Sequence, residues 1–207
     1  RLICANLWNL CQNNTYNDHK QQNRINAPAG NFESLQAALD NGCDSVYFGV
    51  EQLNMRARAS VNFTMDDLAE IAKRCEAKNV RSYLTLNTII YDHDLSVVKT
   101  LINKAKEANI TAVIASDQAV LAMARSVGME VHISTQLNVT NIETIKFYSL
   151  FADTMVLSRE LSLRQVKKIT EQIEKEQIKG PNGNLVEIEI FGHGALCMAV
   201  SGKCYLS

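Results

Sequence analysis

The segment RSYLTLNTIIYDHDLSVVKTLINKAKEANITAVIASDQ, residues 81–118, decides the fold class. Its two ends, 81–88 and 111–118, are short apolar runs that finish in polar residues, as strands do. Four apolar residues between these runs recur at the spacing of one helix face: Leu95, Val98, Ile102 and Ala105. A strand, a helix and a second strand in this order indicate a parallel βα unit.

The same unit repeats along the chain. Further apolar runs that end in polar residues occupy 45–56, 130–138, 153–160 and 186–194. One amphipathic pattern follows Thr64, and another begins at Ser162 and ends at Gly180. Thr and Ser commonly cap helix N-termini, so we expect helices to start at both positions. The strands are dense in Val, Ile, Leu and Ala, as expected when helices cover a parallel sheet.

Two architectures fit this repeat, a (β/α) barrel and an open doubly wound sheet. Polar residues follow every strand, whereas an open sheet gathers its ligand contacts at one switch point. A dinucleotide-binding sheet would also carry G-x-G-x-x-G after an early strand, and this sequence has none. We therefore predict an α/β fold of the TIM-like (β/α) barrel type.

The number of strands indicates that the barrel is incomplete. Six strands are clear and a remnant covers residues 24–26, whereas about eight strands close such a barrel. Nine of residues 1–24 are Asn or Gln, with no strand or helix period, so we predict a disordered or non-native lead-in there. Residues 25–207 would form a partial barrel, a fragment that lacks the first and last strands and ends in a Cys-containing loop.

Composition excludes several classes of protein. Hydrophobic residues make up 46% and charged residues 21%, which is ordinary for a globular domain. The net charge of −1 argues against a generally basic nucleic-acid-coating protein. The sequence has no apolar run long enough to span a membrane and no signal-peptide pattern at its start. Six cysteines are too sparse for a disulfide scaffold, so we expect a reducing, cytoplasmic setting.

Polar residues at the strand ends are the candidates for binding. In a barrel these ends meet at one mouth, where cations and amides suit an anionic or hydroxylated ligand. The candidate substrate-binding residues are Arg56, Arg58, Asn87, Asp117, Gln136, Asn138 and Arg159. Some of them could instead cap helices, and Asp117 stands directly before a helix pattern.

Three residues are candidates for acid–base catalysis. Glu189 and His193 are the leading pair, because one ends a strand and the other follows four residues later. Glu160 is the third, although an ion pair with a neighbouring loop explains it equally well. The sequence has no H-E-x-x-H and no G-x-S-x-G protease motif.

Cys197 and Cys204 share a glycine-rich stretch with C-x₆-C spacing and are the candidate metal ligands. Thiolates bind soft metals and iron–sulfur clusters, but two thiolates are half of the usual set of four. Two alternatives to metal binding therefore remain for both cysteines, a role in packing and a free thiol.

The stretch EIFGHGALCMAVSGKCYLS, residues 189–207, resembles the signature of the collagenase-like peptidases of unassigned catalytic type (peptidase family U 32). Supporting blocks are APAGN (27–31), STQLNVTN (134–141) and LSRELSL (157–163), so the resemblance covers residues 27–207. Two departures are NRIN, in place of an apolar first strand, and Gln118–Ala119, in place of a Pro-Gly pair.

The resemblance implies more than the residues show by themselves. Members of the family have a barrel-like N-terminal domain and were first described as proteases, including collagenases. Similar members help to hydroxylate the tRNA wobble uridine, a ribosomal RNA base or the ubiquinone ring. Those members carry a four-iron–four-sulfur cluster whose first two cysteines match Cys197 and Cys204, and some depend on prephenate.

Three hypotheses follow from these patterns. The leading one is a fragment of an iron–sulfur-dependent RNA-modifying enzyme that hydroxylates the wobble uridine of tRNA. The second is a peptidase of the family's original description, with a peptide substrate. The third is an accessory binding module without turnover.

Overall fold

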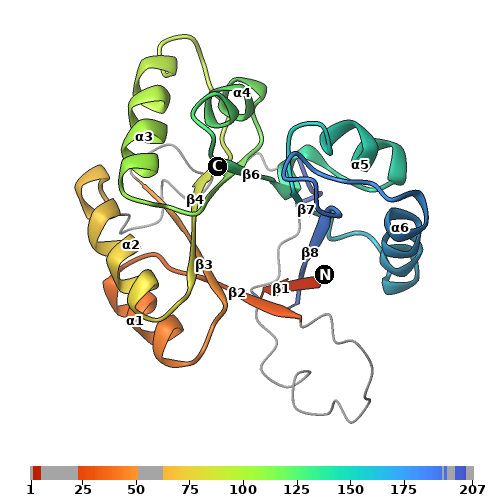
Figure 1. The fold of residues 1–207 in the computed structure, drawn as a ribbon, viewed down its shortest axis with the longest axis horizontal. Coiled ribbons are helices and arrows are strands. Elements are labelled where there is room, and N and C mark those ends of the chain that lie inside the picture. Colours follow the sequence, from red (N-terminus) through yellow and green to blue (C-terminus); the bar gives the residue numbers. More distant parts are fainter. Residues whose placement is uncertain (1, 6–22, 51–62, 193, 195–198, 204–207) are drawn as a thin grey trace.

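The computed structural model describes residues 2–5, 23–50, 63–192, 194 and 199–203. Within these ranges the strands pair in one closed ring of parallel strands (Figure 1). The strands are β1 (Leu2–Ala5), β2 (Arg24–Pro28), β3 (Ser45–Gly49), β4 (Arg81–Leu86), β5 (Ala112–Ala115), β6 (Glu130–Ile133), β7 (Thr154–Val156) and β8 (Glu187–Phe191). Each strand pairs with the next along the chain, and β8 pairs with β1.

Helices surround the ring on its outer side (Figure 1). They are α1 (Phe32–Asp40), α2 (Leu68–Ala77), α3 (Leu95–Glu107), α4 (Gln118–Ser126), α5 (Ile142–Tyr148) and α6 (Leu163–Glu176), with the 3₁₀ turns η1 (Met65–Asp67) and η2 (Thr135–Leu137). From β2 to β8 each pair of consecutive strands is joined through one of these helices, which is the connectivity of a (β/α) barrel. The predicted TIM-like α/β fold is therefore confirmed.

The closed ring corrects our expectation that the first and last strands are missing. Strand β1 lies inside the stretch 1–24 that we predicted to be a lead-in, and β2 begins at Arg24. In the register, Ile3 is opposite Arg24 of β2 and Glu189 of β8, so β1 closes the gap between these strands. A strand ladder uses backbone groups alone, and four residues are too few to show a side-chain period. The sequence pattern therefore missed β1.

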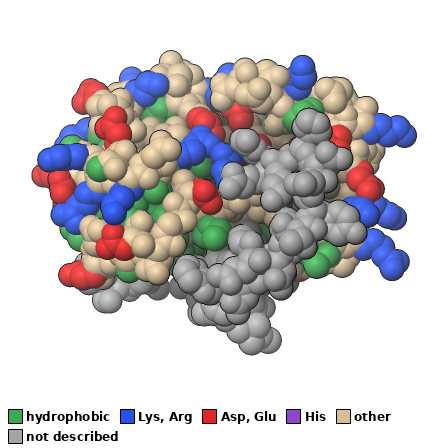
Figure 2. Space-filling view, turned by 60° about the horizontal axis from the view of Figure 1, so that its bottom comes forward, with side chains coloured by type: hydrophobic (Ala, Val, Ile, Leu, Met, Phe, Trp, Pro, Cys, Tyr) green, Lys and Arg blue, Asp and Glu red, His purple; other side chains and the backbone are tan. Residues whose placement is uncertain are grey.

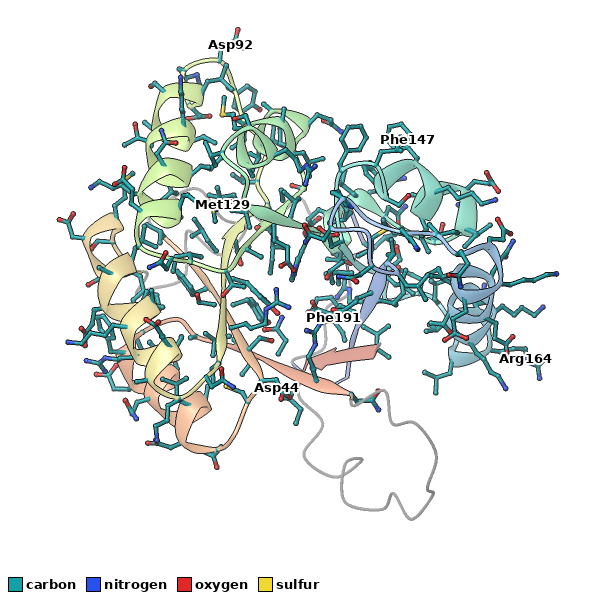
Figure 3. All side chains as sticks on the ribbon, viewed as in Figure 1. Asp44, Asp92, Met129, Phe147, Arg164 and Phe191 are labelled. Atoms are coloured by element: carbon teal, nitrogen blue, oxygen red, sulfur yellow. The ribbon has the colours of Figure 1, made fainter. Side chains whose placement is uncertain are left out.

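The main hydrophobic core lies between the ring and the helices. It includes fully buried strand residues such as Val46, Leu84 and Ile133, together with helix residues such as Leu35 and Leu101. Because side chains alternate along a strand, the intervening residues point into the ring. Side chains from several strands project into this interior (Figure 3).

Local sequence sets the helix ends. Asn31 starts α1 with a capping box, since its side chain accepts from the Ser34 amide. Ser162 starts α6 in the same way, as we predicted. The helix ends at Glu176, earlier than the predicted Gly180, because Gln177 adopts a left-handed φ of 52°.

Candidate active site at the barrel mouth and interior

A buried carboxyl group lies inside the barrel. Glu189 on β8 is 5% exposed, and Asn26 Nδ2 on β2 donates a hydrogen bond to its Oε1 at 2.9 Å. Its other oxygen, Oε2, has no hydrogen-bond partner among the described residues. Burial raises the pKa of Glu189, although the Asn26 hydrogen bond and the charges of His132 and Arg24 act in the opposite direction. This carboxyl is therefore suited to hold and release a proton nearer to neutral pH.

A second interior cluster joins β4 and β6. Glu130 accepts from Arg81 Nη2 at 2.6 Å, and its other oxygen lies 2.9 Å from His132 Nε2. Burial opposes the ionisation of Glu130, but the His132 hydrogen bond and the charges of His132 and Arg81 outweigh it and hold its pKa at about 2. The His132 ring is fully buried and packs edge-on against Tyr83, with 4.5 Å between the ring centroids. Glu130 is thus a charged acceptor at neutral pH, at the beginning of β6.

A second Arg–Glu ion pair joins the beginnings of β2 and β8, where Arg24 Nη2 donates to Glu187 Oε2. Together with the pair Arg81–Glu130, it places charges at the amino ends of the strands. Charged groups in such a place need partners, because desolvating an unpaired charge is costly. Both pairs are partly buried. Each of them joins two strands that are far apart in sequence.

The rim at the carboxyl ends of β4, β6 and β7 gathers three of the predicted binding residues. Ser134 Oγ lies 3.5 Å from Asn87 Nδ2 and accepts from the Gln136 amide at 3.3 Å. Asn138, in a left-handed conformation at the end of η2, accepts from Ser158 Oγ at 2.7 Å. These amides and hydroxyls form a hydrogen-bonding surface at one mouth of the barrel, and their role in binding stays a prediction.

Other predicted site residues have structural partners. The Asp117 side chain accepts from the Ala119 amide at 2.8 Å and so caps α4, which was the alternative for this residue. Arg159 Nη2 donates to the Ala199 carbonyl at 2.6 Å. Glu160 Oε1 accepts from the Ser201 amide at 2.8 Å, and this bond lowers the pKa of Glu160. An exposed carboxylate with a lowered pKa is poorly suited to the acid–base role predicted for Glu160.

Several predicted residues lie outside the described part of the chain. They are Arg56, Arg58, His193, Cys197 and Cys204. The pairing of Glu189 with His193 and the metal site therefore stay predictions. Among the described residues, no group of three or more His, Cys, Asp or Glu side chains is placed to hold a metal ion.

The interior residues Asn26, Arg81, Glu130 and His132 were missed by the sequence reasoning. They stand within strands, where apolar residues are expected, and not after the strand ends. The available signal was alternation, as in EVHI (130–133) and EIEI (187–190), where every second residue is polar or charged. Such alternation in a barrel strand marks a polar interior.

Comparison with known proteins identifies the family. The family model described as Peptidase family U32 matches residues 30–207. The chain belongs to peptidase family U32. A collagenase from Porphyromonas gingivalis strain W83 is 57% identical over 183 residues, which cover 88% of this chain and 44% of that protein. Members named for RNA modification are more distant relatives of this U32 chain.

Two bacterial relatives are named for the modification of RNA. The tRNA hydroxylation protein P1 of Bacillus subtilis is 31% identical over 184 residues, which cover 87% of this chain and 41% of the relative. The 23S rRNA 5-hydroxycytidine C2501 synthase of Escherichia coli is 32% identical over 182 residues, which cover 87% of this chain and 26% of that enzyme. This U32 chain thus spans less than half the length of these curated relatives.

A solved structure shares the fold. The structure of a U32 peptidase superposes with a TM-score of 0.62 at 13% identity and covers 88% of this chain and 98% of that one. In the part of this U32 chain that the structure describes, every helix is too short or too polar to cross a membrane. On the face that Figure 2 shows, basic and acidic side chains are interspersed, in keeping with the net charge of −1.

Proposed function

We propose that this chain is the barrel part of an iron–sulfur-dependent enzyme that hydroxylates RNA, with the wobble uridine of tRNA as its substrate. The observation that carries the proposal is the buried Glu189, whose strand leads directly into the stretch that contains Cys197 and Cys204. Relatives with 31–32% identity are named for hydroxylation of tRNA and of 23S rRNA, and they support an RNA substrate.

Within this proposal, Glu189 holds or releases a proton. Asn26 fixes one oxygen of its carboxyl group, and Oε2 is left to act on a reacting group. The side-chain amide of Asn87, which lies beside Ser134 at the rim, would hydrogen-bond a nucleobase, because amides recognise the edges of unstacked bases. The side-chain amide of Gln136 would do the same.

The iron–sulfur cluster and prephenate enter through the family resemblance. Cys197 and Cys204 would supply two thiolates, and this donor chemistry suits iron. A bound cluster would supply electron transfer. Among the other cysteines, Cys43 and Cys75 are buried in the helical layer, and burial raises the pKa of Cys75 to about 11. These two thiols are therefore poor ligands, and further ligands would come from elsewhere.

A peptidase is the second candidate function, because the collagenase relative has the higher identity, 57%. In that case Glu189 and His193 would be the acid–base pair acting on a peptide bond. An accessory module without turnover is the third candidate, and it predicts that Glu189 is dispensable for any reaction.

A chimera separates these functions. In this chimera, the present chain replaces the corresponding region of the Bacillus subtilis tRNA hydroxylation protein P1. The chimera is expressed in a strain that lacks that protein. Hydroxylated nucleosides are then measured in its tRNA by mass spectrometry. We expect the chimera to restore hydroxylated uridine, Glu189→Gln to lower it at least about tenfold, and the exposed Glu174→Gln to leave it unchanged.

The contrary outcomes are distinct. A chimera that accumulates in folded form but restores no hydroxylated nucleoside would overturn the proposal. Cleavage of gelatin by the purified chain, lost in Glu189→Gln and retained in Glu174→Gln, would establish the peptidase instead.

A further inference from the structure

The segment 199–203 is fastened to the rim at the ends of β6 and β7. Ser201 is its centre and is 2% exposed. The Ser201 amide donates to Glu160 Oε1 at 2.8 Å, and Ser201 Oγ accepts from the Arg159 amide at 3.3 Å. Thr135 Oγ1, in η2, lies 3.4 Å from the same hydroxyl. One serine thus joins the loops that follow two neighbouring strands.

Two further contacts extend this attachment along the segment. Arg159 Nη2 donates to the Ala199 carbonyl at 2.6 Å. Gly202 has a φ of +75° and lies so close to η2 that a Cβ there would be 2.7 Å from the Gln136 carbonyl oxygen. Ala199, Ser201 and Gly202 are therefore contacted by η2 and by the loop that follows β7. We call these contacts of Thr135, Gln136, Arg159 and Glu160 with segment 199–203 the rim clamp.

We propose that the rim clamp fixes residues 199–203, the middle of the C-x₆-C stretch, and that Glu160 is a positioning residue within the clamp. The clamp grips the middle of this stretch, since Ala199 follows Cys197 by two residues and Gly202 precedes Cys204 by two. Fixing backbone before a ligand binds lowers the ordering entropy that binding must offset. The benefit of a pre-ordered backbone for a metal centre rests on the proposed function. The contacts of the rim clamp do not depend on that function.

The clamp makes a prediction about Glu160 that differs from catalysis. Glu160 acts through one oxygen that accepts a backbone hydrogen bond. Gln has the same acceptor oxygen in nearly the same place, but it cannot transfer a proton. Glu160→Gln should therefore preserve the clamp, whereas Glu160→Ala should release it. A catalytic carboxyl would lose its function in both variants.

Hydrogen exchange of the 207-residue chain, measured by mass spectrometry, reports on the hydrogen bond from the Ser201 amide to Glu160. We expect Glu160→Ala to speed exchange in peptides covering 199–203 about tenfold, because a hydrogen bond to a charged acceptor is lost. Glu160→Gln should stay within about threefold of the wild type, since neutral acceptors bond more weakly. Glu174→Ala, an exposed change on α6, should leave this exchange unchanged, and circular dichroism checks that all variants are folded.

Two results would overturn the clamp. One is unchanged exchange at 199–203 in a folded Glu160→Ala variant. The other is exchange in Glu160→Gln as fast as in Glu160→Ala. Iron content after anaerobic treatment of the chimera with ferrous iron and sulfide separates the two proposals. A chimera without iron contradicts the cluster, and the exchange rates still decide the clamp.

Discussion

Acid should weaken the barrel through Glu130, which joins β6 to β4 by its contact with Arg81. Burial favours the neutral acid, but the hydrogen bond from His132 and the charges of His132 and Arg81 prevail, and they hold the pKa at about 2 against an ordinary 4.5. At about 1.4 kcal/mol per pKa unit, this difference corresponds to roughly 3 kcal/mol of the free energy of unfolding. Because the folded-state pKa is lowered, the stabilisation is complete above pH 4.5 and is lost as the pH falls towards 2.

The substitution Glu130→Gln removes the charge and keeps the size of the side chain. We expect it to lower the free energy of unfolding by roughly 3 kcal/mol at pH 7 and by about half as much at pH 3. Urea unfolding followed by far-ultraviolet circular dichroism at several pH values measures both. The matched control is Glu143→Gln, which breaks an exposed pair with Lys146 and should cost less than about 0.5 kcal/mol. Wild-type and Glu130→Gln stabilities that stay parallel from pH 7 to pH 3 would refute the reasoning.

Three further predictions concern single positions. Glu189→Gln should raise the free energy of unfolding at pH 8 more than at pH 4, because a raised folded-state pKa costs stability as the pH rises above the ordinary 4.5; equal effects at both pH values would contradict the burial argument. Gly202→Ala should destabilise more than Gly128→Ala in thermal melts, since both have positive φ but a Cβ meets atoms within 4 Å only at Gly202; equal shifts would count against the close approach. Asn31→Ala should cost about 1 kcal/mol in urea unfolding by removing the cap of α1, whereas no loss would mean that the cap is dispensable.

Local features of the fold could be predicted from the sequence because they depend on neighbouring residues. Residues 81–118 form β4, α3 and β5 as expected, and Ser162 starts α6. Periods of two and of 3.6 residues report backbone geometry over a few residues, and a cap depends on groups three residues apart. Strand β1 was missed because four residues are too few for a period, and its pairing with β8 involves residues at the other end of the chain.

The candidate site was only partly predictable for the same reason. Glu189 was chosen from its place in the sequence, but its partner Asn26 is 163 residues away. Nothing local distinguishes Glu160, an exposed anchor of segment 199–203, from Glu189, a buried carboxyl with a raised pKa. The sequence alone determined the order of strands and helices and the side of each that is apolar. The tertiary structure decided which polar groups meet inside the ring, because burial and distant charges, which set a group's pKa and hydrogen bonds, exist only once the strands have closed around it.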